Sequence, residues 1–337
     1  MRSPRADSSL VQWMLLALPA AVFLAVVVTA FPNAPATRTL HPSLASLPPD
    51  SSAREIYPVD YWEGGAYVSL PMGKVRYWLI GPEDGERIVL IHGLSVPAII
   101  WQHVAPQLAD AGYRVLLYDL YGRGYSDAPQ TTYDTVLYTS QLALLMQHIG
   151  WTKAHVVGVS MGGGIAVAFA AQFPQLVSDR LALVACSGLI EPTDLSRTAK
   201  FLSSPLMQFF TSSYPFRKYL QHLTSSEPWE DPISELVRVQ SAYLPGFNPA
   251  VASSLRDGPV RGLSSAYEAI GRRAEEGMRV LLIWGTKDHV VPYATAARVR
   301  ALVPQAELIT IEGAPHGVLL SHAEQVRDAL LRFFKGS

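Results

Sequence analysis

Gly158-Val159-Ser160-Met161-Gly162 lies between an apolar run, Ala154 to Val157, and a run of small and apolar residues, Gly163 to Ala168. A short apolar strand that passes through Gly-x-Ser-x-Gly into a helix is typical of a nucleophile elbow, where a serine hydroxyl projects from a sharp turn. Glycines are needed on both sides of that turn because a Cβ would collide with the adjoining strand or helix. The pentapeptide therefore predicts Ser160 as a nucleophile at the end of a strand.

An acid and a histidine that lie further along the chain supply the two groups that a serine nucleophile requires. Such a serine requires an imidazole to accept its proton and a carboxylate to orient the imidazole. Asp288 follows the apolar run from Leu281 to Trp284, and His316 follows the run from Leu308 to Ile311. Because each comes just after a predicted strand, we predict Asp288 as the orienting acid and His316 as the base.

Three other residues have less favourable positions for these roles. Glu312 precedes His316 by four residues and competes as the acid, but Asp288 has the better place at a strand end. His322 falls in the predicted helix beyond the last strand and is expected at the surface. Asp119 ends a strand before a glycine-rich turn and is expected to brace that turn rather than to take part in catalysis.

A second loop is predicted to supply the oxyanion hole. The apolar strand from Ile88 to Ile91 ends in His92-Gly93-Leu94, where the glycine lets the loop bend so that the N–H of Leu94 faces the serine. The N–H of Met161, at the start of the helix after the nucleophile, is the second expected donor. Two preorganised donors stabilise the oxygen that gains charge in the transition state. We expect His92 to shape this loop rather than to act as a base or metal ligand.

Short runs rich in Val, Leu and Ile alternate with helical stretches along the chain. This alternation indicates an α/β fold with a mostly parallel, eight-stranded sheet and helices on both faces. The predicted strands are Ala66–Leu70, Lys74–Ile80, Arg87–Ile91, Tyr113–Tyr118, Ala154–Val159, Asp179–Ala185, Arg279–Trp284 and Ala306–Ile311.

The alternation breaks between residues 189 and 262. Ser204-Pro205 and Asp231-Pro232 each pair a capping residue with a proline at the first helical position, and apolar residues follow at helical spacing. We therefore predict a helical cap insertion at 189–262 within a catalytic domain formed by 61–188 and 263–337. Phe209 and Phe210 either line an apolar substrate passage in this cap or pack it on the body of the domain.

The N-terminal region has a different composition. Leu10 to Phe31 holds no charged residue, and its length matches the hydrocarbon core of a bilayer. Arg2 and Arg5 precede it, which favours a cytoplasmic N-terminus. We expect residues 1–31 to be a transmembrane signal anchor, with the catalytic domain lumenal or extracellular. The alternative is a secreted protein released by cleavage of a signal peptide. Residues 32–60 are predicted to be a stalk or linker.

Composition excludes several classes of partner. The formal net charge is −1 and no block of Lys or Arg occurs, so the sequence has no electrostatic footprint for a nucleic acid. Cys186 is the only cysteine, which excludes an internal disulfide and a cysteine-clustered metal site. The sequence does not define an oligomeric state.

From about Tyr67 to Phe334 the chain resembles the α/β-hydrolase superfamily of the cap-bearing type. The motifs that carry the resemblance are Leu90-Ile91-His92-Gly93, Asp119-Leu120-Tyr121-Gly122-Arg123-Gly124-Tyr125-Ser126-Asp127, Gly158-Val159-Ser160-Met161-Gly162-Gly163, Trp284-Gly285-Thr286-Lys287-Asp288 and Pro315-His316-Gly317. The resemblance implies Ser160 as nucleophile, His316 as base and Asp288 as orienting acid, with no cofactor and no metal. In its anchor and apolar cap the chain is similar to membrane-anchored monoacylglycerol lipases.

The expected activity is hydrolysis of carboxylic esters through an acyl-serine intermediate, with lipid esters such as monoacylglycerols as the leading substrates. The alternatives are a C–C-bond hydrolase or a proline-type aminopeptidase on the same triad, and a non-catalytic, receptor-like α/β-hydrolase. The family's C–C-bond hydrolases usually carry Gly-Pro-Gly after the oxyanion glycine, whereas this chain has Leu94-Ser95-Val96-Pro97. That difference disfavours the C–C-bond alternative.

Overall fold

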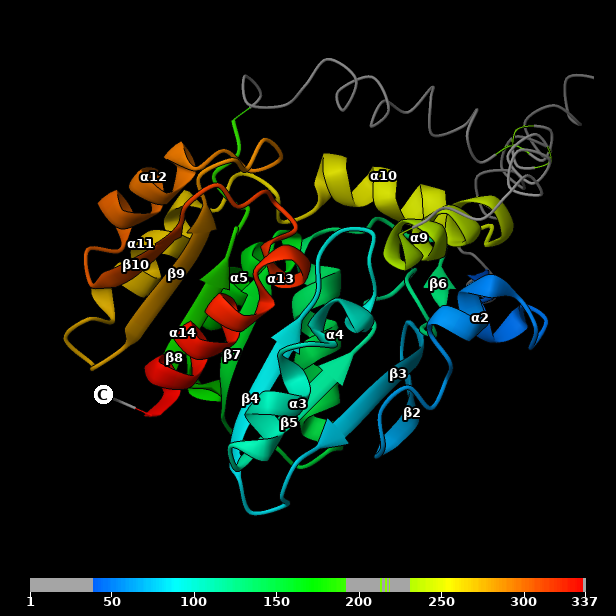
Figure 1. The fold of residues 1–337 in the computed structure, drawn as a ribbon, viewed down its shortest axis with the longest axis horizontal. Helices are drawn as coiled ribbons and strands as arrows, with labels where there is room; N and C mark the ends of the chain where they lie inside the picture. The colour runs from blue at the N-terminus through cyan, green and yellow to red at the C-terminus, as the bar shows by residue number, and fades with distance from the viewer. Residues whose placement is uncertain (1–38, 192–212, 214–215, 217, 219–230, 336–337) are drawn as a thin grey trace, which may run out of the picture. The chain divides into compact units, whose positions relative to one another are not determined.

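One eight-stranded sheet carries the fold, with the strand order β10-β9-β8-β7-β4-β5-β3-β2. The computed structural model describes residues 39–191, 213, 216, 218 and 231–335, which Figure 1 draws in colour. The strands of this sheet are β2 (Gly65–Leu70), β3 (Gly73–Ile80), β4 (Glu86–Ile91), β5 (Tyr113–Tyr118), β7 (Ala154–Val159), β8 (Val177–Val184), β9 (Arg279–Gly285) and β10 (Ala306–Ile311). A separate two-stranded ladder pairs β1 (Leu40–His41) with β6 (Ala128–Pro129).

The strands from β5 to β10 across the sheet are parallel, whereas β3 and β2 are added in antiparallel fashion at one side. The expectation of a mostly parallel, eight-stranded sheet is therefore confirmed. The register places Val159 beside Val184 in β7 and β8, and Gly285 beside Ile311 in β9 and β10. The carboxyl ends of these strands consequently meet at one edge of the sheet, where open α/β sheets bind their ligands.

Side chains alternate between two cores, one on each face of the sheet, as the period of a strand requires. In β4, Val89 and Ile91 enter one core while Ile88 and Leu90 enter the other. The first core is covered by α4 (Thr135–His148), α5 (Met161–Gln172), α11 (Ser264–Arg272) and α12 (Ala294–Leu302). The second is covered by α3 (Ala105–Asp110), α13 (Val318–Ser321) and α14 (Ala323–Lys335), and Figure 1 shows α3 and α14 in front of the sheet.

Two described helices belong to the predicted cap, α9 (Pro232–Tyr243) and α10 (Phe247–Asp257), and both come between β8 and β9 in the chain. Figure 1 shows them lying across one end of the sheet. Helix α9 begins where the sequence predicts, because the Asp231 carboxylate accepts hydrogen bonds from the N–H groups of Ile233 and Ser234. Phe209 and Phe210, the residues of the predicted substrate passage, lie outside the described residues.

Residues 40–60 pack against the catalytic domain, and this corrects the prediction of a stalk or linker over 32–60. The segment contains a 3-10 helix (Leu44–Ser46) and α2 (Ser52–Ile56), and α2 packs on the cap helix α9. Leu44 and Tyr57 are fully buried. The high content of Pro and Ser suggested a solvated chain, but these few apolar side chains are enough to fix the segment on the surface of the domain.

Tyr57 ties this N-terminal segment to Asp119, a fully buried carboxylate at the end of β5. The Tyr57 hydroxyl donates to Oδ1 at 3.1 Å, and the backbone N–H groups of Ala98 and Tyr125 donate to the same carboxylate at 2.9 and 2.8 Å. Burial raises the pKa of Asp119 to about 7, although these three donors act in the opposite direction. The predicted role of Asp119 in bracing the turn after β5 is confirmed.

Leu40–Ser337 forms one compact unit. No helix in the described ranges is both long and apolar enough to span a bilayer. The segment predicted as an anchor, residues 10–31, lies outside those ranges, as do residues 32–38 of the predicted stalk.

We predict that Tyr57→Phe destabilises the protein more at high pH than at low pH. The hydroxyl donates to Asp119, and a hydrogen bond to a charged group is worth about 1.5–3 kcal/mol against about 1 kcal/mol for a neutral one. The pKa of Asp119 is about 7, so at pH values below 7 the carboxyl is protonated in the folded state. The substitution then removes only a hydrogen bond to a neutral group and costs less stability. Urea unfolding at pH 5.5 and 8.5 measures the two free energies of unfolding.

Tyr61→Phe is the matched control, because the Tyr61 hydroxyl donates to the amide oxygen of Gln102, which does not titrate. Its cost should be the same at both pH values. A Tyr57→Phe cost that does not grow as the pH rises through 7 would contradict the proposed coupling between Tyr57 and the charged form of Asp119.

Candidate active site

Ser160 occupies the sharp turn between β7 and α5 with a positive φ of 54° and a ψ of −122°. This region is costly for a residue with a Cβ and is found where surrounding structure enforces it. The turn is held by the Ser160 N–H, which donates to the carbonyl of Val184 in β8 at 2.9 Å, and by the Gly163 N–H, which donates to the carbonyl of Ser160 at 2.9 Å.

The glycines that flank the turn are required by close backbone contacts. A Cβ on Gly158 would lie 2.2 Å from the carbonyl oxygen of Gly162, on the opposite arm of the elbow. A Cβ on Gly162 would lie 2.3 and 2.4 Å from the carbonyl oxygens of Ile91 and His92 at the end of β4. The Gly-x-Ser-x-Gly pattern thus allows the elbow to touch the neighbouring loop, as the sequence predicts.

His316 and Asp288 extend from Ser160 as a continuous chain of hydrogen bonds. Ring nitrogen Nε2 of His316 lies 3.0 Å from Oγ of Ser160, and Nδ1 lies 2.8 Å from Oδ2 of Asp288. Asp288 follows β9 and His316 follows β10, so the parallel register brings both to the carboxyl-terminal edge beside the elbow. The structure therefore brings together the three side chains that the sequence singles out.

The Asp288 carboxylate is buried and held on its other side as well. Its Oδ1 accepts hydrogen bonds from the N–H groups of Val290 and Val291 at 2.9 and 2.8 Å, which leaves Oδ2 for the imidazole. With Asp288 accepting from Nδ1–H, the neutral imidazole keeps Nε2 free to take the serine proton. The competing acid Glu312 contacts the Thr286 hydroxyl instead, and His322 contacts Ser321.

The loop after β4 holds the predicted oxyanion donor Leu94 through the side chain of His92. The Leu120 N–H donates to His92 Nε2 at 2.9 Å, so the ring proton is on Nδ1, which lies 2.9 Å from the carbonyl oxygen of Gly93. That carbonyl shares a peptide unit with the N–H of Leu94. Since the two groups of a trans peptide point in opposite directions, the Leu94 N–H points away from the His92 ring.

His92 is fully buried, and burial lowers its pKa to about 3, with the positive charge of Arg123 acting in the same direction. The ring is therefore neutral at physiological pH and keeps both of its hydrogen bonds. The prediction that His92 shapes the loop agrees with these contacts. The second predicted donor, Met161, is the buried first residue of α5.

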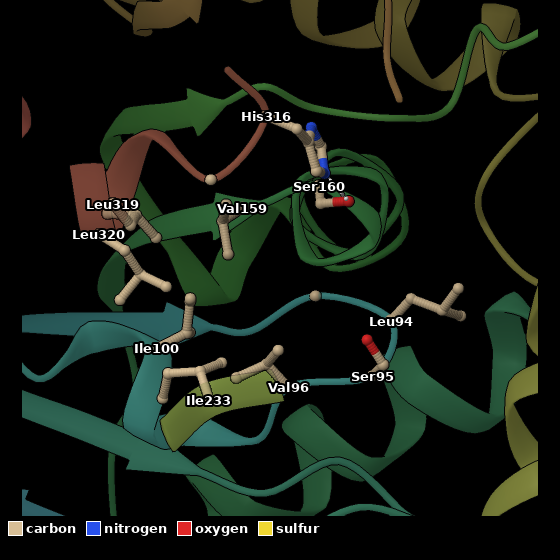
Figure 2. Close-up of a pocket in the computed structure, with 12 residues that line it drawn as sticks. Leu94, Ser95, Val96, Ile100, Val159, Ser160, Ile233, His316, Leu319 and Leu320 are labelled. Atoms are coloured by element: carbon tan, nitrogen blue, oxygen red, sulfur yellow. Dashed lines mark hydrogen bonds between the residues drawn. The ribbon is translucent and has the colours of Figure 1, made fainter. Parts of the chain in front are cut away.

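A cavity of about 210 Å³ opens beside Ser160 and His316 (Figure 2). Figure 2 shows the Ser160–His316 pair on one side, with Val96, Ile100 and Ile233 facing it. Apolar side chains form most of the wall. The full lining is Gly93, Leu94, Ser95, Val96, Ile100, Val159, Ser160, Ile233, His316, Gly317, Leu319 and Leu320.

Several lining residues were not predicted from the sequence. Ile233 comes from the cap helix α9, and Leu319 and Leu320 come from α13, just after the histidine loop. Each is an apolar residue in a helix, so the sequence does not show whether its side chain lines the cavity or packs in the core. Within the described ranges, no group of His, Cys, Asp and Glu side chains is arranged to hold a metal ion.

Comparison with known proteins places this chain in a family. The family model for the alpha/beta hydrolase fold matches residues 86–323. A non-heme chloroperoxidase of Streptomyces lividans is 30% identical over 76% of this chain and 94% of its own length. A 2-hydroxymuconate semialdehyde hydrolase of a Pseudomonas species is 28% identical over 71% of this chain and 83% of its own length. The chain therefore belongs to the α/β-hydrolase family and is a hydrolase of that family.

Solved structures agree on the fold. A hydrolase from Pseudomonas aeruginosa superposes with a TM-score of 0.66 at 19% identity, over 81% of this chain and 98% of that one. At this identity the likeness concerns the fold alone. The reactions named for the two sequence relatives differ from each other, so the reaction of this chain has to be argued from its own site.

We predict that the stability gap between the wild type and His92→Gln narrows as the pH falls from 6.5 towards 4. In the wild type His92 stays neutral when folded but gains a proton when unfolded, because its folded pKa is about 3. The folded state thus binds fewer protons, and stability is lost on acidification by up to about 1.4 kcal/mol per pH unit. Glutamine does not titrate.

Unfolding in urea at several pH values gives the free energy of unfolding of each protein as a function of pH, and the slopes of the two curves are compared. His103→Gln is the control, because it makes the same substitution at an exposed position outside the core. Parallel curves of unfolding free energy against pH for the wild type and His92→Gln would mean that His92 takes up a proton as readily in the folded as in the unfolded protein. That result would contradict a neutral His92 ring in the folded state.

Proposed function

We propose that this protein is a serine hydrolase that cleaves carboxylic esters through an acyl intermediate on Ser160. One observation carries the proposal: Ser160, His316 and Asp288 form a hydrogen-bonded chain with contacts of 3.0 and 2.8 Å, and Ser160 and His316 lie in the wall of an apolar cavity. A serine in this arrangement transfers its proton to the imidazole as it attacks a carbonyl carbon.

In the first half of the reaction, Ser160 Oγ forms a bond to the ester carbonyl carbon while its proton moves to His316 Nε2. The carbonyl oxygen becomes an oxyanion, for which the N–H groups of Leu94 and Met161 are the proposed donors. Asp288 stabilises the imidazolium that forms. The tetrahedral intermediate then breaks its bond to the alcohol oxygen, which takes the proton from His316, and acyl-Ser160 remains.

In the second half, water replaces the alcohol. His316 Nε2 takes a proton from the water as its oxygen bonds to the acyl carbon, and the same two N–H groups face the new oxyanion. The bond to Ser160 Oγ then breaks, Oγ recovers the proton from His316, and the carboxylic acid leaves. The cycle consumes one ester and one water and needs no further reactant.

The chemistry of the cavity wall favours an ester over the alternatives. None of the described residues that line it is Lys, Arg, Asp or Glu. An aminopeptidase must hold an ammonium group, and a C–C-bond hydrolase of the type named for the Pseudomonas relative acts on an acidic substrate. Both need a charged partner, because a buried unpaired charge is costly. A neutral, apolar ester needs none.

The N-terminal sequence supports a lipid ester as the substrate class. We propose that the uncharged segment from Leu10 to Phe31 anchors the protein in a membrane, with the catalytic domain on the lumenal or outer side. A site next to the bilayer and an apolar cavity together favour amphiphilic esters such as monoacylglycerols.

We predict that Ser160→Ala and His316→Ala each abolish turnover of p-nitrophenyl esters, with losses on the order of 10⁶-fold in kcat. Asp288→Asn should leave a small residual rate, with a loss on the order of 10⁴-fold, because the acid only orients the base. A fluorophosphonate probe should label the wild type at Ser160 and fail to label Ser160→Ala.

Glu312→Gln and His322→Ala are the matched controls and should retain activity, since neither side chain contacts the triad. Near-normal activity in His316→Ala would show that another base is used. Absence of labelling and of turnover in the wild type would favour a non-catalytic receptor. Faster turnover of a dienoate ketone or an aminoacyl amide than of esters would favour the C–C-bond hydrolase or the aminopeptidase.

We predict that the full-length protein stays with the membrane pellet after alkaline carbonate extraction, whereas a chain that begins at residue 40 is soluble. Protease added to intact cells should digest a catalytic domain on the outer side. In sealed microsomal vesicles, whose lumen is inside, a lumenal catalytic domain should be protected from added protease. A soluble catalytic domain that lacks residues 10–31 in cells expressing the full gene would instead identify the segment as a cleaved signal peptide.

A further inference from the structure

Arg123 is a fully buried guanidinium in the turn that follows β5. Its hydrogen-bond partners in the described part of the chain are carbonyl and hydroxyl oxygens, and none of them is a carboxylate. Buried arginines are normally paired with an acid because an uncompensated charge is costly to bury. Arg123 therefore carries its positive charge into the interior for a reason other than ion pairing.

The planar fork of Arg123 connects four parts of the structure. Its Nε–H donates to the carbonyl of Leu94 at 2.8 Å. Its Nη1 donates to the carbonyl of Tyr121 at 3.0 Å and to the hydroxyl of Tyr138 in α4 at 2.7 Å. Its Nη2 donates to the hydroxyl of Ser254 in α10 at 2.8 Å. The residue thus joins the oxyanion loop, its own turn, a core helix and the cap.

The hydroxyl protons of this network have one consistent arrangement. Ser254 Oγ donates to the carbonyl of Ala250 at 2.6 Å, so it accepts from both Arg123 Nη2 and the Tyr138 hydroxyl, which lies 2.6 Å away. Tyr138 in turn accepts from Arg123 Nη1. Each group has a partner, and such a satisfied buried network holds its members rigidly.

The contact with Leu94 places Arg123 next to the proposed oxyanion donor. His92 holds the carbonyl that precedes the Leu94 N–H, and Arg123 holds the carbonyl that follows it. The two peptide units on either side of the Leu94 Cα are therefore both fixed. A guanidinium without a carboxylate partner also places positive charge beside the loop that faces the oxyanion, and this charge acts strongly in a poorly hydrated interior.

We propose that Arg123 is a positioning residue for catalysis: it fixes the Leu94 N–H for the oxyanion and links that loop to the cap helix α10 through Ser254. This inference rests on the proposed ester hydrolysis and adds a residue to its machinery. Arg123 touches neither the substrate nor the triad in this scheme. It acts on the transition state through Leu94, so its loss lowers kcat more than it changes KM.

The test compares an ester with its thionoester, in which sulfur replaces the carbonyl oxygen and accepts hydrogen bonds more weakly. The ratio of kcat/KM for the two substrates reports on the oxyanion hole and does not depend on how much of the enzyme is folded. We expect Arg123→Met to lower this ratio about tenfold or more and kcat by about 10²-fold, as for the loss of an oxyanion donor. Arg123→Lys keeps the charge but loses the fork and should be intermediate.

Ser254→Ala is the matched control, since it removes the cap contact and leaves the Arg123–Leu94 hydrogen bond in place. Because Arg123 keeps its hydrogen bond to Leu94 in this variant, the ester-to-thionoester ratio should fall less in Ser254→Ala than in Arg123→Met. An unchanged ratio in both Arg123 variants overturns the proposal, as does an equal fall in Ser254→Ala. A wild type that neither hydrolyses the ester nor labels at Ser160 contradicts the proposed function instead.

Discussion

The backbone contact between the serine elbow and the end of β4 is the constraint on which the site depends. At Gly162 the two segments lie so close that an added Cβ would come within 2.3 Å of the Ile91 carbonyl oxygen. This approach is possible only because β4 and β7 are parallel neighbours whose register ends at the same edge. The serine, the predicted oxyanion donors and the histidine loop are then within reach of one another without long side chains.

The same edge explains how much of the site could be predicted. Ser160, Asp288 and His316 each follow a strand that is recognisable from a local apolar run, and the order of parallel strands fixes where such strands end. The sequence carries no signal for the roles of Tyr57 and Arg123, because their partners Asp119 and Ser254 lie 62 and 131 residues away in sequence. Polar residues in a Pro- and Ser-rich segment or a glycine-rich turn are usually solvated, and only tertiary packing buries these two.

The turn after β5 holds several distant segments of the chain together through hydrogen bonds. Asp119 holds the N-terminal segment through Tyr57, Arg123 holds the oxyanion loop and α10, and the Gly124 N–H donates to Gln240 of α9 at 2.8 Å. The buried carboxyl group of Asp119 and the buried guanidinium of Arg123 thus lie four residues apart in one turn without pairing with each other. Each instead uses its hydrogen bonds to attach a different part of the chain to the edge where Ser160 lies.

The docking of residues 40–60 has a practical consequence for work on the isolated domain. A fragment trimmed at the composition boundary near residue 61 would lack Leu44 and Tyr57, both fully buried in the intact fold. It would expose the apolar surface that they cover and leave Asp119 with one donor fewer. Such a fragment is a candidate for aggregation, and a sound expression boundary lies before residue 40, upstream of the ladder between β1 and β6.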